Sequence, residues 1–290
     1  MAESVVMTVG ISVPAYRNSQ RLRRCLTSIA RCDASWLVHT VVVDDSGDGS
    51  VAAALQTEFP QVHWIVHHGN RGFAEAANHA VSSNECEYVL LLNDDCEIVR
   101  DPRPALQGLF ASNDVFAVAL RSADEHGRTR EGAKRLVWKA GLAKVLHNPR
   151  DQRPLVEGLC ESDYAVGGHA VFDRAKFIAL SGFDALFHPF YWEDVDLSQR
   201  AHARGWRVLY AQNTEILHRE DGAIRATHES AHIRAVTLRN RLLFSARHGS
   251  GVSRWLLPWT VRWLTLTAWL RRDTLRLQVL RKFTVTNKSV

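Results

Sequence analysis

Runs of consecutive apolar residues alternate with helical stretches through residues 1–121. Each run is continuous rather than interrupted by polar residues, which is typical of strands buried on both faces of a parallel sheet. Polar segments follow three of these strands, and we expect them to converge because ligands bind beyond the carboxyl ends of parallel strands. The pattern predicts strands at residues 9–13, 38–44, 62–67 and 88–93, and helices at 20–30, 51–58, 74–82 and 103–110.

The middle of the chain has a weaker pattern. Residues 122–160 are rich in charge, Gly and Pro, so we expect a long loop or insertion beside the site. Residues 164–218 contain a Gly-Gly turn, an aromatic segment and a helix that begins with Glu193, Asp194 and Asp196. Acids in a first helical turn match the positive end of the helix dipole.

Residues 251–290 are a basic segment that holds four of the nine tryptophans. Arg262 and Arg281 interrupt its apolar face, and Pro258 is expected to kink or break the helix. The segment is typical of a helix at a membrane surface, while packing on the protein's own core or on a second subunit, as in a homodimer, explains it equally. No stretch reaches the roughly 18 uncharged apolar residues of a membrane span. At about 100° per residue, the apolar face collects Trp255, Trp259, Trp263, Leu266, Trp269, Leu270, Leu277 and Leu280.

The net charge of +5 is concentrated in this tail, where eight Lys and Arg residues accompany one acid, Asp273, so that residues 1–250 carry −2. The tail has no recognised nucleic-acid-binding motif, and we expect no nucleic-acid partner. The five cysteines form no CxxC pair, and the N-terminus lacks the pattern of a signal peptide. These features favour a cytoplasmic protein, attached to the inner face of the cytoplasmic membrane if the tail binds lipid.

Acidic residues follow two of the predicted strands. One apolar strand ends abruptly in Asn93, Asp94 and Asp95. Hard oxygen ligands at a strand end suit Mg²⁺ or Mn²⁺ holding a diphosphate, while a turn that caps the backbone is the structural alternative. Asp44 and Asp45 end an earlier strand, where a carboxylate can accept the imide N–H of uracil or thymine. An Asx turn explains that pair equally.

Two further segments combine small, cationic and acidic residues. Residues 69–78 place two glycines and Arg71 at a loop-to-helix junction, where the helix N-terminus attracts phosphate. Packing of alanines on the sheet is the alternative, and the segment is not a Walker loop. Glu193, Asp194 and Asp196 follow an aromatic segment, and at most one or two of them can face a cleft there. A carboxylate beside aromatic walls has a raised pKa that suits a general base. A capped helix start is again the alternative.

In order and spacing, segments across residues 9–248 resemble inverting family 2 glycosyltransferases with the GT-A fold, and more narrowly their rhamnosyltransferase-type members. The matching segments are Val13-Pro14-Ala15-Tyr16-Arg17-Asn18, Val42-Val43-Asp44-Asp45-Ser46, Gly69-Asn70-Arg71-Gly72-Phe73-Ala74 with Asn78, Leu92-Asn93-Asp94-Asp95, Val166-Gly167-Gly168, Gly182-Phe183-Asp184, Glu193-Asp194-Val195-Asp196-Leu197 with Arg200 and Gly205, His218, and Arg239-Asn240-Arg241-Leu242-Leu243-Phe244.

The resemblance implies an α/β fold of GT-A type: a Rossmann-like, nucleotide-binding mixed sheet flanked by helices, with a C-terminal helical extension. It implies a glycosyltransferase domain at residues 1–248 and a basic, Trp-rich amphipathic tail at residues 249–290. Within the domain, residues 1–121 would form the nucleotide-sugar half and residues 161–218 the acceptor and catalytic half.

The resemblance also assigns roles to residues. Asp194 matches the catalytic base, and Glu193 the acid before it. Asp95 matches the final, metal-binding Asp of the family's DXD motif, whose first position here is Asn93, a change that weakens the charge on the metal. His218 falls where related enzymes place a histidine near the metal or diphosphate, and a buried, hydrogen-bonded histidine is the alternative.

The implied cofactor is Mg²⁺ or Mn²⁺, and the implied partners are a nucleotide-diphosphate sugar and a glycan or lipid-linked acceptor of bacterial surface polysaccharide synthesis. Uracil and thymine present the same hydrogen-bonding edge, so UDP- and dTDP-sugars both fit, with rhamnose a candidate sugar. The residues assigned to the nucleotide are Pro14, Ala15, Tyr16, Arg17, Asp44, Asp45, Asn70, Arg71, Gly72, Phe73, Asn78, Asn93 and Asp94. Those assigned to the acceptor or sugar are Gly167, Gly168, Tyr191 and Trp192.

The implied reaction is a single displacement that inverts the anomeric centre. The acceptor hydroxyl loses its proton to Asp194 as its oxygen attacks C1, and the cation neutralises charge on the departing diphosphate. A nucleotidyltransferase is one alternative, but it would have a Gly-rich phosphate loop after the first strand. A non-catalytic nucleotide-sugar binder or scaffold of the same fold is the other, and it would have no need of Asp194.

Overall fold

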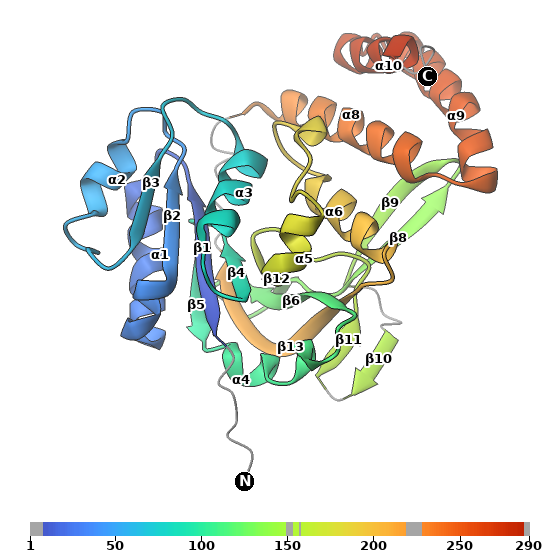
Figure 1. Cartoon of the computed structure of the whole chain (residues 1–290). Helices are drawn as coiled ribbons and strands as arrows, with labels where there is room; N and C mark the ends of the chain where they lie inside the picture. The colour runs from blue at the N-terminus through green and yellow to red at the C-terminus, as the bar shows by residue number, and fades with distance from the viewer. Residues whose placement is uncertain (1–7, 149–152, 157, 219–227, 287–290) are drawn as a thin grey trace.

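The computed structural model describes residues 8–148, 153–156, 158–218 and 228–286, and its centre is one mixed sheet of eleven strands (Figure 1). The order along the sheet is β10-β11-β13-β6-β12-β4-β1-β2-β3, with β5 paired to β13 and β7 to β6. The strands are β1 (Val9–Ala15), β2 (Thr40–Asp44), β3 (His63–Val66), β4 (Tyr88–Leu92), β5 (Cys96–Arg100), β6 (Val115–Ala123), β7 (Thr129–Glu131), β10 (Arg153–Val156), β11 (Leu159–Glu161), β12 (His169–Asp173) and β13 (Arg207–His218).

The first four strands are parallel, and β12 is the element that makes the sheet mixed. It runs antiparallel to β4 on one side and to β6 on the other. Its first residue, His169, lies opposite Leu92, the last residue of β4. The two halves of the chain therefore share one sheet, and the turn before β12 lies at the edge where β4 ends.

Helices cover both faces of this sheet, because alternate residues of each central strand point to opposite sides. Leu90 and Leu92 pack with α1 (Ser19–Cys32) in one apolar core, whereas Val89 and Leu91 pack with the helices of the other face in a second core. The remaining helices of the domain are η1 (Ala34–His39), α2 (Ser50–Leu55), α3 (Phe73–Ser83), α4 (Arg103–Leu106), η2 (Leu109–Ala111), α5 (Arg174–Ala179), η3 (Ala185–Phe187) and α6 (Glu193–His202).

The predicted α/β class is confirmed, and most of the predicted strands and helices of the first half are present. Three boundaries are wrong, one of them in α2, which ends at Leu55 although the helix was predicted to reach residue 58. Residues 38 and 39 belong to η1 rather than to β2, and the helix predicted at 103–110 is divided into α4 and η2 by Gly108, whose φ is 78°. Left-handed backbone is open to glycine and cannot continue a helix.

The prediction of a long loop at residues 122–160 is wrong. This part of the chain contains β7, β10, β11 and a separate hairpin of β8 (Lys134–Lys139) and β9 (Leu142–His147). Ala140 and Gly141 form its turn with φ of 49° and 80°, the backbone of a tight two-residue hairpin. Lys and Arg residues interleave with the apolar ones and conceal the strand pattern. The apolar side packs on the C-terminal helices, where the Trp138 ring lies 6.2 Å from that of Phe244.

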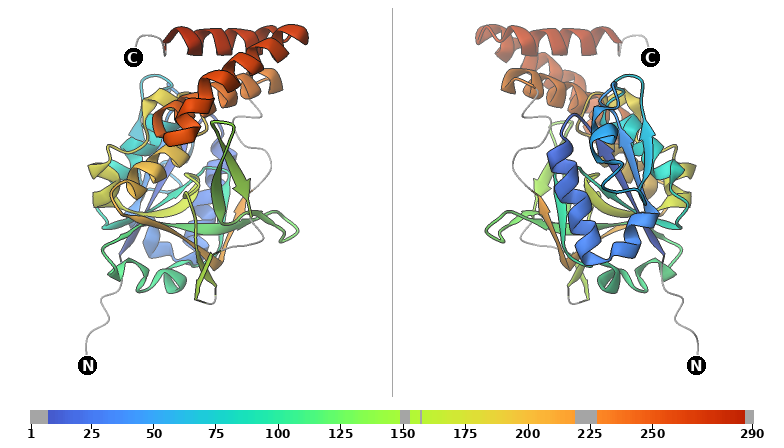
Figure 2. Two further views of the ribbon diagram at one scale, coloured as in Figure 1. Left: turned by 90° about the vertical axis from the view of Figure 1, so that its right-hand side faces the viewer. Right: turned by 90° about the vertical axis from the view of Figure 1, so that its left-hand side faces the viewer.

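Three helices follow the sheet: α8 (Ser230–His248), α9 (Gly251–Leu270) and α10 (Thr274–Thr286). They lie beyond the edge at which β1, β2 and β4 end, as Figure 1 and the two views of Figure 2 show. Pro258 lies inside α9 without ending it, and the chain leaves the helix only at Arg271. Among the described residues, no helix combines the length and the apolar character needed to cross a bilayer.

Candidate active site

Loops after β1, β2 and β4 meet at the predicted edge of the sheet, and backbone hydrogen bonds join them. Asp45 N donates to Ala15 O over 2.9 Å, and Arg17 N donates to the Ser46 hydroxyl over 3.1 Å. Tyr16 N donates to Asp94 over 3.3 Å. The loops assigned to the nucleotide from the sequence therefore do lie together, next to Pro14 at the end of β1.

Asp44 and Asp45 are both buried, and neighbouring backbone occupies their oxygens. Asp44 accepts hydrogen bonds from the N–H groups of Ser46 and Ala52, at 2.9 and 2.8 Å. Asp45 accepts the N–H groups of Arg71 and Gly72, at 2.9 and 2.8 Å, and contacts the His67 ring at 2.7 Å. Both carboxylates thus hold the neighbouring loops in place, and contact of either with a base remains a prediction.

The segment at residues 70–73 is held above this wall at the start of α3. Gly72 has a φ of 86°, and a Cβ there would lie 2.9 Å from the His188 ring, so the position requires glycine. Asn70 accepts the Gly72 N–H, and the Arg71 guanidinium pairs with Glu75 at 2.9 Å on the exposed side. The Phe73 ring packs against that of Phe183.

Asn78, on the same helix, is occupied by the second half of the chain. Its carbonyl oxygen accepts the N–H of Phe183 and its amide donates to the carbonyl of the same residue, both at 2.8 Å. These bonds fasten α3 to the turn before η3. Both polar atoms of the Asn78 side chain take part in these bonds, and its contact with the nucleotide remains a prediction.

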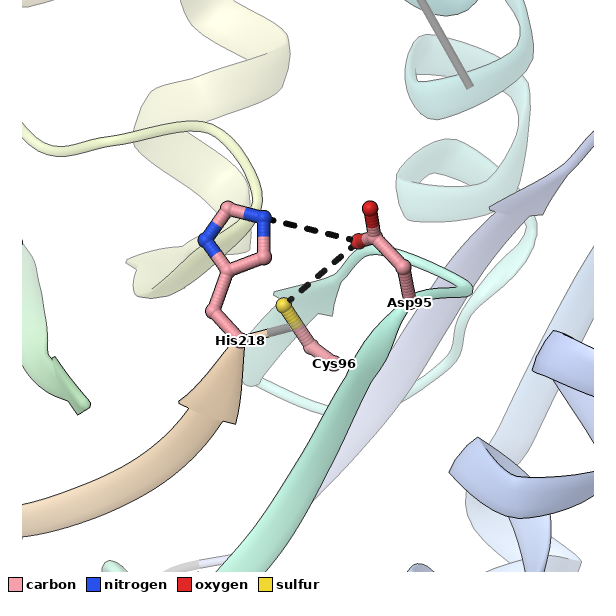
Figure 3. Close-up of side chains that lie close together, drawn as sticks. All are labelled: Asp95, Cys96 and His218. Atoms are coloured by element: carbon pink, nitrogen blue, oxygen red, sulfur yellow. Dashed lines mark hydrogen bonds and ion pairs between the residues drawn. The ribbon is translucent and has the colours of Figure 1, made fainter. Parts of the chain in front are cut away.

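Asp95 and His218 form the candidate metal centre (Figure 3). His218 is the last residue of β13 and is paired in register with Cys96, the residue after Asp95. The His218 Nε2 lies 3.7 Å from Asp95 Oδ1, and ligand atoms of Asp95, Cys96 and His218 lie within 4.8 Å of one another. Burial raises the pKa of the Cys96 thiol well above its ordinary value, so the thiol stays protonated and is a poor ligand.

Asp95 and His218 therefore fit a divalent cation that keeps coordination positions for a diphosphate. Burial opposes ionisation of Asp95, but the hydrogen bond and charge of His218 outweigh it and hold the pKa below its usual range. Burial and the charge of Asp95 raise the pKa of Asp94 to about 7. The buried Nδ1 of His218 has no hydrogen-bond partner among the described residues.

A glycine pair connects this centre to the start of α6. Asn93 N donates to Gly168 O over 2.9 Å, and a Cβ on Gly168 would lie 2.4 Å from the Asn93 amide. Gly167 N lies 3.5 Å from Asp194 Oδ2. The strand end that carries Asp95 and the helix start that carries Asp194 therefore lie on either side of one two-residue turn.

A strained turn places Asp194 at the beginning of α6. Tyr191 and Trp192 have φ of 68° and 79°, a left-handed conformation that is costly for aromatic residues. Asn240 of α8 stabilises it, because its buried amide donates to the carbonyls of Phe187, Phe190 and Tyr191 over 2.6, 2.9 and 3.0 Å. Tyr191 is exposed and Trp192 is buried, so only the first can present its ring to a ligand from solvent.

Glu193 and Asp194 are adjacent carboxylates with different surroundings. Glu193 is buried with Oε2 unpaired in the described structure, and burial followed by the charge of Asp194 raises its pKa well above the ordinary value. Asp194 is partly exposed and accepts the Val195 N–H over 2.8 Å. Burial raises its pKa to about 6, against the opposing effect of that bond and of the Gly167 N–H.

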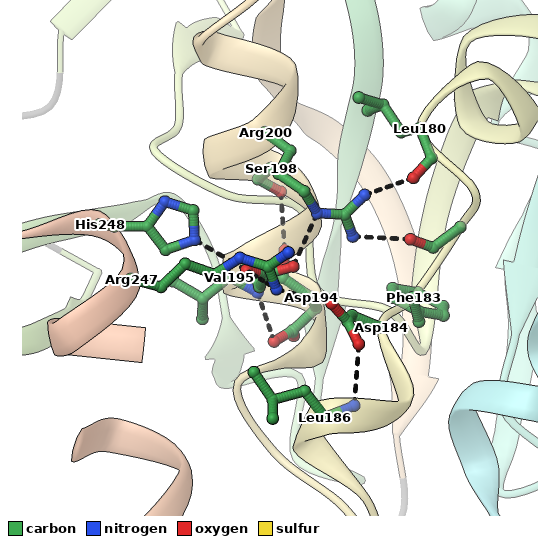
Figure 4. Close-up of polar contacts among 12 residues, drawn as sticks. Leu180, Phe183, Asp184, Leu186, Asp194, Val195, Ser198, Arg200, Arg247 and His248 are labelled. Atoms are coloured by element: carbon green, nitrogen blue, oxygen red, sulfur yellow. Dashed lines mark hydrogen bonds and ion pairs between the residues drawn. The ribbon is translucent and has the colours of Figure 1, made fainter. Parts of the chain in front are cut away.

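The third acid of the helix, Asp196, has a structural role, and its partners Arg200, Arg247 and His248 are labelled in Figure 4. It is fully buried and contacts Arg200 and His248 at 2.7 Å each and Arg247 at 3.3 Å. Arg200 also donates to the carbonyls of Leu180 and Gly182, over 2.5 and 2.6 Å. Asp196 therefore connects α6 to α8 and to the loop before η3.

A polar cluster around the buried Lys134 was not predicted from the sequence. The Lys134 ammonium is completely buried, forms an ion pair with Glu131 and lies 2.9 Å from His147. The charges of Glu131 and Lys134 both act on Asp194, the first raising its pKa and the second lowering it. His169, 6.0 Å from His218 ring to ring, is buried with both nitrogens unpaired in the described structure, and burial lowers its pKa to about 4.

Comparison with known proteins gives a family and a set of relatives. The model of the family described as "Glycosyl transferase family 2" matches residues 11–180. Two curated proteins named N-acetylglucosaminyl-diphospho-decaprenol L-rhamnosyltransferase, from Mycobacterium tuberculosis strains CDC 1551 / Oshkosh and ATCC 25618 / H37Rv, are 27% identical over 274 residues. The match covers 85% of this chain and 87% of each relative.

Solved structures share the fold at low sequence identity. GalNAc-T7 with UDP, GalNAc and Mn²⁺ matches with a TM-score of 0.63 and 14% identity over 82% of this chain, which spans about half (48%) of that structure. The mannosyltransferase PcManGT from Pyrobaculum calidifontis, with GDP-Man and Mn²⁺, matches with a TM-score of 0.56 and 18% identity over 97% of this chain and 75% of its own. TarS 1–349 of S. aureus with UDP matches with a TM-score of 0.55 and 15% identity over 85% of this chain and 68% of its own.

Proposed function

This chain belongs to glycosyl transferase family 2 and is a glycosyltransferase, and from that premise we propose that it transfers a sugar with inversion from a UDP- or dTDP-sugar to a lipid-linked acceptor. The donor sugar that we propose is rhamnose, because the curated relatives are named as L-rhamnosyltransferases. Their printed acceptor is a diphosphate-linked polyprenol carrying N-acetylglucosamine, and a saccharide of that chemical class is the acceptor that we propose here.

The arrangement around Asp194 is the observation that carries this proposal. A partly exposed carboxylate with a pKa near 6 starts a helix, and the Gly167–Gly168 turn separates it from the Asp95 centre. At neutral pH such a group is ionised, yet more basic than an ordinary aspartate. It can take the proton of an acceptor hydroxyl while that oxygen attacks C1 of the donor sugar.

The other residues position the donor and exclude water. In our proposal the loops at 14–17 and 70–73 hold the nucleoside, and Asp95 with His218 hold Mg²⁺ or Mn²⁺ beside the diphosphate. The bound cation would supply positive charge near the leaving group. Attack from the Asp194 side and departure on the Asp95 side require opposite faces of the sugar, so the product has the inverted anomeric configuration.

A transfer assay with a single substitution tests the proposal. The purified protein is incubated with dTDP-rhamnose or UDP-sugars, a polyprenyl-diphosphate saccharide and Mn²⁺, and the anomeric configuration of the product is assigned by NMR. We expect Asp194→Asn to lower the rate by about 100-fold or more, the usual contribution of a positioned base, without weakening donor binding.

Asp114→Asn is the matched control, because Asp114 forms a surface ion pair with Arg207 outside the site. Wild-type activity is expected for this variant. Full transfer by Asp194→Asn would remove Asp194 from the role of base, and a product with the donor's own anomeric configuration would refute the single displacement.

A further inference from the structure

Helix α9 has two apolar faces, and only one of them is used by the fold. The inner face packs against α8, α10 and the β8–β9 hairpin in a cluster with Leu242, Leu280 and Leu142. The opposite face, here called the tryptophan face, is exposed to solvent. The inner face consists of Leu257, Val261, Leu264 and Ala268, and the tryptophan face of Val252, Trp255, Trp259, Trp263, Leu266, Trp269 and Leu270.

The structure divides the apolar stripe expected from the sequence. Leu280 is buried and Leu277 partly buried in the helical cluster, whereas every tryptophan of α9 is between 57% and 66% exposed. Elsewhere in the described chain no tryptophan is exposed to this degree. Packing of these rings on the protein's own core, one of the alternatives from the sequence, is thus excluded in the described structure. A helix needs only one buried face, so the second one indicates a partner.

Arginine side chains are exposed along α9, and Arg262 borders the tryptophan face. Arg254, Arg262, Arg271 and Arg272 are exposed on α9 and the turn that follows, and Asp273 is the one acid of residues 251–290. The Arg262 guanidinium lies over the Trp259 ring, 4.9 Å from its centroid. A second copy of the chain is a poor partner, because a two-fold interface would bring identical arginine clusters together.

We propose that the tryptophan face of α9 docks the enzyme on the surface of a bilayer that contains anionic phospholipids. Tryptophan and arginine suit this environment, because the indole rings sit at the headgroup level and the guanidinium groups pair with lipid phosphates. The helix would lie in the plane of the surface, in keeping with its lack of a membrane-spanning segment among the described residues.

Docking through α9 would place the candidate active site close to the membrane surface. Asn240 and Asp196 fasten α8 to the catalytic turn, and α8 carries α9 through their common apolar cluster. The helices lie on the side of the molecule where β1, β2 and β4 end (Figure 1). The inference deepens the proposed function and rests on it for the lipid-linked acceptor, which would reach the site from the same surface.

Vesicle co-sedimentation of the full chain tests the inference without donor or acceptor. We expect binding to phosphatidylcholine vesicles with about 30% phosphatidylglycerol, weaker binding to phosphatidylcholine alone, and release as salt rises from about 0.1 to 0.5 M. Trp255→Ser/Trp259→Ser/Trp263→Ser should lower the partition coefficient about 100-fold, and Arg254→Gln/Arg271→Gln about 25-fold, at roughly fivefold for each residue.

Matched controls replace exposed residues outside the tail. Val38→Ser/Val99→Ser/Ile178→Ser removes three exposed apolar side chains, and Arg31→Gln/Arg100→Gln removes two exposed charges; both should bind like wild type. Undiminished binding by the tryptophan variant, or no binding by wild type, would overturn the inference. So would a wild-type dimer that this variant converts to a monomer in light scattering. If the wild-type protein transfers sugar but does not bind vesicles, the docking alone is refuted. If it binds vesicles but transfers no sugar, the proposed function is refuted instead.

Discussion

Glu193 and Asp194 have opposite relations to solvent although they are neighbours in the chain. Glu193 is buried with an unpaired oxygen, and Asp194 opens toward the Gly167–Gly168 turn. Glu131 and Lys134, which are more than fifty residues earlier, adjust the pKa of Asp194 in opposite directions. Burial is the main cause of the raised pKa of Asp194, and charges from a distant segment of the chain adjust it.

The raised pKa of Asp194 predicts an acid limb in the rate profile. The rate of transfer should fall about tenfold per pH unit below about 6, because the protonated carboxyl cannot accept the acceptor's proton. The measurement is kcat/KM between pH 5 and 8, with donor binding followed in parallel. A kcat/KM that stays constant down to pH 5, as expected for an ordinary aspartate pKa of about 4, would contradict the assignment.

The same shift has a consequence for stability. The pKa of Asp194 is about 6 in the folded protein and about 4 in the unfolded chain. The free energy of unfolding should therefore decrease as pH rises from about 4 to about 6, and the charged carboxylate is destabilising at pH 7.

Among the elements, α8 stabilises the turn at Tyr191 and Trp192 that precedes Asp194. The left-handed Tyr191 and Trp192 depend on the Asn240 amide for three hydrogen bonds that no residue of their own loop supplies. Sequence spacing identifies Asn240 as part of the family resemblance, but its role is visible only in three dimensions, because its partners lie about fifty residues earlier.

Asn240→Ala should leave the fold intact but relax this turn. Three buried carbonyls lose their donor, and we expect a loss of about 2–4 kcal/mol in the free energy of unfolding, measured by urea denaturation. Transfer should fall more than donor binding, since the turn carries Asp194 rather than the loops assigned to the nucleotide. Gln278→Ala, on the exposed side of α10, is the control. Wild-type kcat for Asn240→Ala would show that the turn does not position Asp194.

At the scale of the whole molecule, the hydrophobic pattern predicted the parallel half well, because its strands are continuous apolar runs that end in polar loops. It failed at the β8–β9 hairpin, where charged residues such as Lys134 occupy strand positions and one of them is buried by pairing rather than by apolar character. The site followed the same division. Acidic residues at a strand end and a helix start drew attention to Asp95 and Asp194, and the family resemblance selected them, whereas Glu131, Lys134 and His169 depend on contacts between distant segments.

Binding of the nucleotide and binding of the cation are expected to depend on each other. UDP or dTDP with Mn²⁺ should raise the melting temperature by about 5 °C at 100 times its dissociation constant, and EDTA should remove most of this shift. GDP and CMP serve as controls for the base, and Asp95→Asn should abolish the part that depends on Mn²⁺. An unchanged Mn²⁺ effect in that variant would place the cation elsewhere.

The contacts of Asp196 with Arg247 and His248 impose an order on synthesis of the protein. The ribosome releases the chain from the N-terminus, so both loops assigned to the nucleotide and α6 emerge before α8 exists. Until residue 248 is available, the buried charge of Asp196 lacks two of its partners and the turn before α6 lacks Asn240. The contacts that hold α6 and the turn before it can therefore be completed only near the end of translation.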